Sequence, residues 1–276
     1  MTLGVVGIGL IGGSVALAAK RADPSLRVIG MDLDGTADAA KAAGVIDAVA
    51  DLDALGRCDV IVLAAPVSAN LAWLDRLAAA ATRAIVTDVG GTKRQMMVRA
   101  QSLPALAFVG GHPMAGSEHS GFGAADAALF EGRRWFLTPG PGATTAQTTV
   151  IEALVTSFGA KTAITDADVH DRVMAAVSAL PQVTASALMA VVGDRVDDEG
   201  LRMSGPGLRD TTRLAGSAAT WMTDGLAHNS REVADAIDAL INQLRLIRDQ
   251  LDTPEHARDL FVRAQAWRKT LLRLGQ

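Results

Sequence analysis

Two histidines and a carboxylate gather in the stretch GGHPMAGSEHSGF, residues 110–122. Its four glycines and its proline favour neither a helix nor a strand, so we predict a tightly turned loop. The ionisable side chains are those of His112, Glu118 and His119. A neutral imidazole at the carboxyl edge of a sheet accepts a proton from a hydroxyl group while a hydride leaves for a cofactor. His112 is therefore a candidate general base.

Other polar residues that could take part in chemistry are the pair His170–Asp171 and the run Arg209-Asp210-Thr211-Thr212-Arg213. An arginine binds a carboxylate through two parallel hydrogen bonds. The local sequence leaves a second interpretation open with equal weight: a histidine bonded only to backbone, and an Arg–Asp pair that closes a helix.

Gly7, Gly9 and Gly12 form the pattern G-x-G-x-x-G between an apolar run and a helical stretch. Such glycines allow a tight turn, let a pyrophosphate approach the backbone and let a helix pack closely on a strand. Asp32 follows Gly12 by 20 residues and ends the second apolar run. A carboxylate there accepts hydrogen bonds from ribose hydroxyls and repels a 2′-phosphate, so we predict NAD rather than NADP.

Several chemistries lack the residues that they need. The chain has no His-Glu-x-x-His pattern or cysteine–histidine cluster for a metal, no serine in a G-x-S-x-G turn, and no tyrosine. The single cysteine, Cys58, excludes an internal disulfide and fits a reducing compartment. The net charge of −4 argues against nucleic acid or an anionic membrane as partner, and the start MTLGVVGIG lacks the layout of a signal peptide. We expect a cytoplasmic protein.

The sequence has two parts that differ in predicted secondary structure. Short apolar runs alternate with alanine-rich helical stretches up to about residue 164, which predicts a parallel sheet buried on both faces, an α/β Rossmann fold. The predicted strands are residues 3–8, 27–31, 59–64, 84–89, 106–111 and 134–139. After Asp166 the sequence is helical by period and composition. We predict a dinucleotide-binding domain over residues 1–164 and an all-α domain over residues 165–276.

Residues 173–193 carry no charge, a length sufficient to cross a bilayer. Ser178, Pro181, Gln182, Thr184 and Ser186 interrupt this stretch, which favours a buried helix at a subunit or domain interface over a membrane span.

The motifs GIGLIGGS, DVGGTK, GGHPMAGSEHSGF, HD and GLRDTTRLA resemble, in this order over about residues 3 to 250, the prephenate/arogenate dehydrogenase family of tyrosine biosynthesis. The resemblance implies NAD-dependent oxidative decarboxylation of a cyclohexadiene. It also implies a homodimer built by intertwined C-terminal helices, in which the uncharged helix belongs to the dimer core. In this family the histidine at the position of His112 accepts a hydrogen bond from the 4-hydroxyl group as C4 gives up hydride.

The same resemblance implies roles for further residues. Arg213 matches the arginine that binds the substrate carboxylate, while Asp210 and Glu118 match an ionic network around the pocket mouth. The implied cofactor ligands are Gly7, Gly9, Gly12 and Asp32, with Pro66 lining the same cleft.

The chain departs from the family pattern at three places. Gly91 and Thr92 replace the Ser-Val of D-V-x-S-V-K, so we expect His112 to be held by Thr92, by water or by the substrate. The family sequence S-H-L-P-H is Ser-Ala-Leu-Pro-Gln here, which places Gln182 at a substrate-binding position. The usual Met-Trp pair after RDTTR is inverted to Trp221-Met222. These changes bear on the substrate, not on the cofactor or reaction type.

Three alternatives stay open at this point. A relative that oxidises 4-amino-4-deoxyprephenate shares all the motifs. A non-catalytic NAD-binding sensor does not need His112 and Arg213 to face one pocket. A β-hydroxyacid dehydrogenase needs a lysine on the first helix of its second domain, and residues 166–192 contain none.

Overall fold

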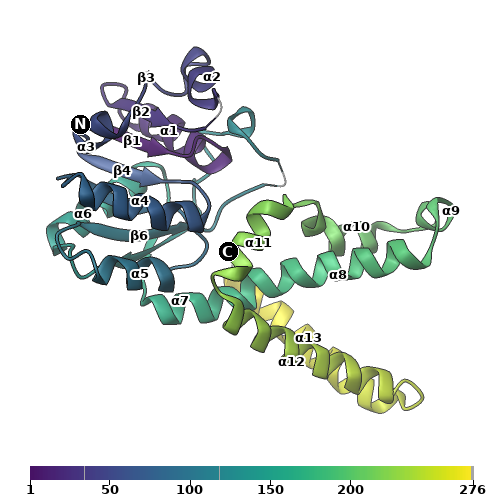
Figure 1. The fold of residues 1–276 in the computed structure, drawn as a ribbon. Helices are drawn as coiled ribbons and strands as arrows, with labels where there is room; N and C mark the ends of the chain where they lie inside the picture. Colours follow the sequence, from purple (N-terminus) through teal and green to yellow (C-terminus); the bar gives the residue numbers. More distant parts are fainter. Residues whose placement is uncertain (34, 118, 275–276) are drawn as a thin grey trace. The chain divides into compact units, whose positions relative to one another are not determined.

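The structure is a computed structural model that describes residues 1–33, 35–117 and 119–274 (Figure 1). The chain divides into two compact units, Met1–Ser230 and Arg231–Gln276. The predicted domain boundary at residues 164 and 165 stays a prediction.

Within the described residues, eight strands form one sheet in the order β3-β2-β1-β4-β5-β6-β7-β8 (Figure 1). The strands are β1 (Thr2–Val6), β2 (Arg27–Met31), β3 (Ala48–Val49), β4 (Val60–Leu63), β5 (Ile85–Asp88), β6 (Phe108–Pro113), β7 (Arg134–Pro139) and β8 (Lys161–Ile164). All six predicted strands exist, and β3 and β8, which are short and lie at the two edges, were not predicted.

The sheet is parallel from β3 through β6, but β7 pairs with β6 in the antiparallel direction and β8 runs parallel to β7. The prediction of a parallel sheet is therefore wrong for β7, the last of the predicted strands. A parallel connection needs a crossover, usually a helix. Between β6 and β7 the described residues contain only the 3₁₀ turn η1 (Phe122–Ala124), so the chain returns in the opposite direction.

Helices cover both faces of the sheet. They are α1 (Leu10–Ala22), α2 (Thr36–Ala42), α3 (Leu52–Gly56), α4 (Val67–Ala79), α5 (Arg94–Gln101) and α6 (Thr145–Ser157). Successive side chains of a strand point to opposite faces. In β4, Val60 and Val62 accordingly enter one buried apolar cluster, while Ile61 and Leu63 enter the other. This two-sided burial explains why the strands are apolar throughout.

The predicted strand at residues 106–111 continues two residues further than predicted, because β6 ends at Pro113 and His112 lies opposite Phe136 of β7. The predicted loop at residues 110–122 is wrong for these first residues. The glycines fit a strand here since their neighbours leave no room for side chains. A Cβ atom at Gly110 would lie 2.7 Å from Met97 Cε, and one at Gly111 would collide with the carbonyl oxygen of Asp88. Close packing thus overrides the low strand propensity of glycine.

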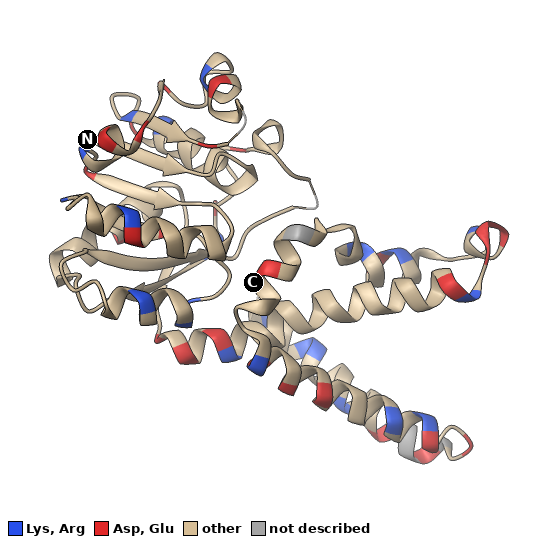
Figure 2. Cartoon of the chain, in the orientation of Figure 1, with Lys and Arg blue, Asp and Glu red and all other residues tan. Residues whose placement is uncertain are grey.

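Residues 167–195 form one continuous helix made of α7 (Ala167–Met174), the π turn η2 (Ala175–Ala179) and α8 (Leu180–Arg195). The following elements are α9 (Asp198–Arg202), α10 (Pro206–Thr212), the 3₁₀ turn η3 (Arg213–Gly216) and α11 (Ala219–Ala227). Figure 2 shows α8 as a long helix without charges before its last turn. α10 and η3 pack against α8.

The 167–195 helix is the one helix in the described part of the chain that has the length and composition to cross a membrane. Its first part, α7, packs against α5, and Arg94 Nε lies 2.5 Å from Asp168 Oδ1.

The second unit holds nearly all of α12 (Ser230–Asp249) and the whole of α13 (Pro254–Leu274). Arg263 Nη2 donates to Gln243 Oε1 at 3.3 Å and joins the two helices. Large apolar side chains stay exposed on them, among them Leu244, Phe261, Trp267 and Leu271.

Candidate active site

The glycine pattern forms the turn between β1 and α1 at the carboxyl edge of the sheet. Gly7 has a φ of +89°, and a Cβ atom on it would lie 2.7 Å from the backbone of Ala64. A Cβ atom on Gly12 would collide with the carbonyl oxygen of Gly7. A Cβ atom on Gly9, by contrast, would meet no atom within 4 Å. Two of the glycines are therefore required by the fold, whereas Gly9 leaves open the space beside the amino end of α1, where a pyrophosphate binds.

Asp32 follows β2 and lies beside this turn. Its Oδ2 accepts a hydrogen bond from the Ile8 N–H at 2.5 Å, and its Oδ1 accepts one from the Leu33 N–H at 2.6 Å. Each carboxylate oxygen keeps a lone pair for a further donor. Pro66 is exposed at the amino end of α4, after the neighbouring strand β4. The residues of this edge fit a dinucleotide with free ribose hydroxyls.

His112 is part of a chain of hydrogen bonds that joins the sheet to α7. Its Nδ1 lies 2.9 Å from His170 Nε2, and His170 Nδ1 lies 2.8 Å from Asp171 Oδ1. Asp171 also accepts the backbone N–H groups of Lys93 at 2.7 Å and Arg94 at 2.9 Å. The side chains of His170 and Asp171 are fully buried.

The donors and acceptors in this series of hydrogen bonds determine the tautomers of His170 and His112. Burial raises the pKa of Asp171, but the hydrogen bonds from His170, Arg94 and Lys93 outweigh it and leave the pKa lowered. The ionised Asp171 only accepts, so His170 donates through Nδ1–H and accepts at Nε2. His112 must then donate through Nδ1–H, which leaves the lone pair of His112 Nε2 free to accept a proton.

His112 is held in the neutral form. Burial lowers the pKa of His112 well below its usual value of 6.5, and electrostatic repulsion of a proton on His112 by the neighbouring His170 and Lys93 lowers it further. At neutral pH the ring is therefore unprotonated and able to act as a base.

The buried pair of Asp88 and Lys93 holds the backbone next to His112. Lys93 Nζ lies 2.5 Å from Asp88 Oδ2, and both side chains are fully buried. Asp88 Oδ1 accepts the Gly111 N–H at 3.0 Å, and its Oδ2 accepts the Gly90 N–H at 2.9 Å. This pair ties the β5–α5 connection to the strand that carries His112.

Gly91 lies directly beside the free nitrogen of His112. A Cβ atom on Gly91 would lie 3.9 Å from His112 Nε2 and would meet no other atom within 4 Å. The hydroxyl group of Thr92 is buried, and it has no hydrogen-bond partner within the described residues. Thr92 thus makes no hydrogen bond with His112, and His170 holds the ring through Nδ1 instead. The expectation that water or the substrate bonds the other ring nitrogen stays a prediction.

The other predicted substrate ligands lie on α8, α10 and η3. Arg213 and Asp210 are exposed, and their side chains make no hydrogen bond or ion pair with the part of the chain that the structure describes. Gln182 is half-buried and is hydrogen-bonded to Leu214 and Ser217. Glu118 lies outside the described residues.

Sequence reasoning assigned no partner to His170 and Asp171 and did not identify the Asp88–Lys93 pair. The adjacent His170–Asp171 and the DVGGTK motif were visible signals. Nothing local linked them, because 58 residues separate His112 from His170.

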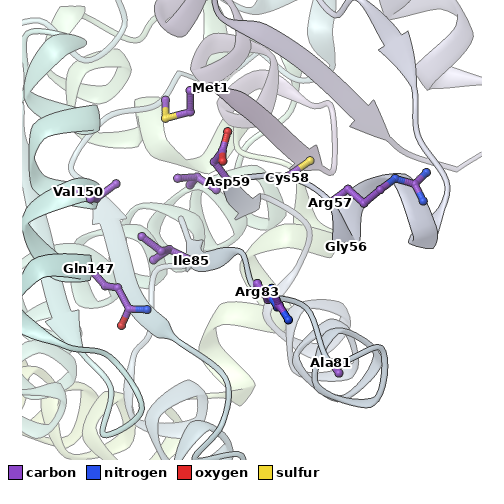
Figure 3. Close-up of a pocket in the computed structure, with 11 residues that line it drawn as sticks. Met1, Gly56, Arg57, Cys58, Asp59, Ala81, Arg83, Ile85, Gln147 and Val150 are labelled. Carbon is purple, nitrogen blue, oxygen red and sulfur yellow. The ribbon is translucent and has the colours of Figure 1, made fainter.

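A separate open pocket of about 950 Å³ lies at the amino ends of β1, β4 and β5, at the opposite edge of the sheet (Figure 3). It is lined in part by Arg57, Cys58, Asp59 and Arg83. Burial raises the pKa of the Cys58 thiol to about 11, so it is not a nucleophile at neutral pH.

Comparison with known proteins identifies the family. A family model described as prephenate dehydrogenase, nucleotide-binding domain, matches residues 15–164, and one described as prephenate dehydrogenase, dimerization domain, matches residues 166–264. The chain belongs to the prephenate dehydrogenase family.

Individual relatives agree with this membership. Prephenate dehydrogenase of Bacillus subtilis strain 168 is 36% identical over 272 residues, which span 94% of this chain and 72% of that protein. Synechocystis arogenate dehydrogenase is 28% identical with a TM-score of 0.79, over 98% of this chain and 100% of that one. Prephenate dehydrogenase from Aquifex aeolicus, solved with hydroxyphenyl propionate and NAD⁺, has a TM-score of 0.88 over 99% of this chain and 98% of that one. At 24% identity this last likeness shows the fold alone.

Membership in the family confirms the predicted family, fold class and enzyme class. The chain is an oxidoreductase with a Rossmann-like nucleotide-binding domain and a helical dimerisation domain. The predicted cofactor, NAD, and the predicted reaction, oxidative decarboxylation in tyrosine biosynthesis, are those of the family.

Proposed function

We propose that this chain oxidises prephenate or arogenate with NAD, and that His112 Nε2 is the atom that receives the proton of the substrate's 4-hydroxyl group. The observation that carries the proposal is the chain Asp171–His170–His112, since it leaves a neutral imidazole with one free lone pair. The same edge of the sheet carries the open glycine turn and Asp32.

His112, His170 and Asp171 then each have a role in the transfer of the proton. NAD, when bound, would accept the hydride from C4 of the substrate. His112 takes the hydroxyl proton at Nε2 and becomes an imidazolium that still donates through Nδ1 to His170. Asp171, two bonds further along, stabilises the positive charge that develops on the two rings. The C1 carboxylate leaves as CO₂, its bonding electron pair makes the ring aromatic, and the proton returns from Nε2 to the phenolate oxygen.

Arg213 is the proposed ligand of the substrate carboxylate, and Asp210 and Glu118 are proposed members of an ionic network because they match the family motif. Its exposed guanidinium, without a partner among the described residues, is available for a bidentate hydrogen bond. The relatives named for prephenate and for arogenate both support this substrate class.

A homodimer built through the C-terminal helices and a cytoplasmic location belong to the same proposal, as does the domain boundary at residues 164 and 165. Three observations support the dimer: the dimerisation-domain match, the largely exposed α8 without charges before its last turn, and the apolar residues exposed on α12 and α13. The free Cys58 suits a reducing compartment.

The test is a spectrophotometric assay of NADH formation with prephenate, arogenate and 4-amino-4-deoxyprephenate. We expect turnover of at least one of the first two, and loss of that turnover in His112→Ala with NAD⁺ affinity retained. Turnover of the amine alone would move the substrate assignment to the third compound. A His112→Ala variant with most of its activity would refute the role of the base.

A further inference from the structure

We propose that Gln182 is a positioning residue that holds the turn carrying Arg213 against helix α8. The inference rests on the proposed role of Arg213 and assigns to Gln182 a role other than direct substrate binding. The turn is η3, residues Arg213–Gly216, and it is followed by Ser217.

The side-chain amide of Gln182 bonds to one residue within this turn and to the residue that follows it. Its Nε2 donates to the carbonyl oxygen of Leu214 at 2.7 Å, and its Oε1 accepts the hydroxyl of Ser217 at 3.2 Å. A second contact of Nε2, to Ser186 Oγ, is at the 3.5 Å limit of a hydrogen bond. Leu214 follows Arg213 directly, so the backbone that carries the guanidinium is bonded to the helix.

A side-chain amide offers two N–H donors and one carbonyl acceptor. In Gln182 one donor and the acceptor are already used within the protein, and the other donor faces Ser186. A direct bond from Gln182 to an acceptor of the substrate, such as its carboxylate, would have to replace one of the two N–H contacts, although Oε1 keeps a second lone pair. The observed bonds therefore favour a structural hold on the turn over a contact with the substrate.

The π turn explains how one helix reaches both His112 and the Arg213 turn. In an uninterrupted α-helix, twelve residues of about 100° each would rotate Gln182 by about 120° from His170. A π turn inserts one extra residue and sets the following side chains back by about 100°, to within about 20° of the face of His170. The structure has such a turn between them, at Ala175–Ala179. Pro181 favours it, because a proline in a helix lacks the N–H that would bond four residues back.

The 167–195 helix therefore carries two supports on nearly one face, His170 for the base and Gln182 for the carboxylate ligand. Gln182→Met tests the second, because methionine keeps the length of the side chain and removes its hydrogen bonds. We expect KM for the substrate to rise about tenfold, with kcat changed less than twofold and NAD⁺ affinity unchanged. Ser186→Ala, which removes only the longest contact, is the matched control and should change KM less than twofold.

A double variant separates a positioning role from a binding role. If Gln182 acts through Arg213, Gln182→Met should raise KM less than twofold further when Arg213→Ala is already present. An equal factor in both backgrounds would mean that Gln182 binds the substrate itself, and would overturn the inference. So would an unchanged KM in Gln182→Met when Arg213→Ala alone raises KM strongly.

Hydrogen exchange tests the hold without any use of activity. The Ser217 N–H bonds to the Leu214 carbonyl oxygen at 3.1 Å, and we expect this amide to exchange at least tenfold faster in Gln182→Met than in Ser186→Ala. Unchanged exchange would overturn the inference. If exchange accelerates but Arg213→Ala leaves KM unchanged, Gln182 holds the turn and the proposed role of Arg213 fails.

Discussion

The glycine turn and the proposed catalytic base of this protein are built by different means. The turn at Gly7, Gly9 and Gly12 is set by backbone geometry within one βα unit. Each glycine matters because it has no Cβ atom, which would collide with the backbone at Gly7 and Gly12 and would fill open space at Gly9. His112 is set by side chains from β6, from the β5–α5 connection and from α7. A short local motif therefore suffices to recognise the first region. The second exists only when distant segments meet.

The largest expected effect is the loss of the base itself. His112→Ala should lower kcat by about 10³, within the range of 10²–10⁴ that general acid–base catalysis contributes. Because the pKa of His112 is lowered well below 6.5, wild-type kcat/KM should stay flat from about pH 8 down to pH 6.5 and fall only at more acidic pH.

The stability of the protein should follow the same titration. A histidine with a lowered folded pKa binds fewer protons folded than unfolded, so its contribution is present above the unfolded pKa of about 6.5 and is lost as pH falls through and below that value. In His112→Ala the free energy of unfolding should depend less on pH in this acidic range. A kcat/KM profile of the wild type that declines below pH 7.5 would contradict the assigned protonation state.

Asp171→Asn tests the side-chain network with a nearly isosteric change. An amide cannot accept from His170, Lys93 and Arg94 together, so the His170 tautomer should be lost and kcat should fall about 10²-fold. Asp168→Asn on the same helix, which loses only a partly exposed pair with Arg94, is the control and should stay within threefold of wild type. Equal kcat values for the two variants would show that the network does not orient His112.

Gly9→Ala tests the backbone-built region. A Cβ atom there meets no protein atom within 4 Å, so the thermal midpoint should stay within about 2 °C while Kd for NAD⁺ rises at least tenfold. Gly12→Ala, whose Cβ collides with the Gly7 carbonyl, should instead lower the midpoint clearly. If Gly9→Ala binds NAD⁺ normally, the cofactor does not approach this turn.

Asp32→Ser should reduce the preference for NAD⁺ over NADP⁺. We expect the wild type to favour NAD⁺ at least tenfold in kcat/KM, which is about 1.4 kcal/mol, and the variant to narrow the ratio. Equal use of the two cofactors by the wild type would mean that Asp32 serves only to bond Ile8 and Leu33.

Gly91→Ser should have the smallest effect. The added Cβ lies at an ordinary contact distance of 3.9 Å from His112 Nε2, so a serine fits without displacing its neighbours. Because His170 already orients the ring, we expect kcat/KM on prephenate or arogenate to be equal to wild type or improved up to about threefold. A tenfold loss would indicate that the hydroxyl occupies the lone pair that the substrate needs.

Much of the fold could be predicted because its signals are local. The apolar strands, the glycine turn and the helical second half each depend on residues close in sequence. The reversed direction of β7 and β8 could not be predicted from strand composition, since direction depends on the connection and not on the strand residues. Gly110 and Gly111 lie within the predicted strand 106–111 despite their low strand propensity, and their packing against Asp88 and Met97 leaves no room for larger residues.

The sequence by itself determined the family and the Rossmann fold with its glycine turn, and it singled out Asp32 and His112 as the proposed ribose ligand and base. Those features are visible in the sequence because each depends on a short local pattern: the spacing of glycines, a run of apolar residues, or a residue type at a motif position. Only the tertiary structure decided what orients His112 and what Gln182 contacts. Hydrogen-bond direction fixes the free nitrogen of His112, and that direction depends on Asp171, which is 59 positions away and comes into line only when α7 packs against α5.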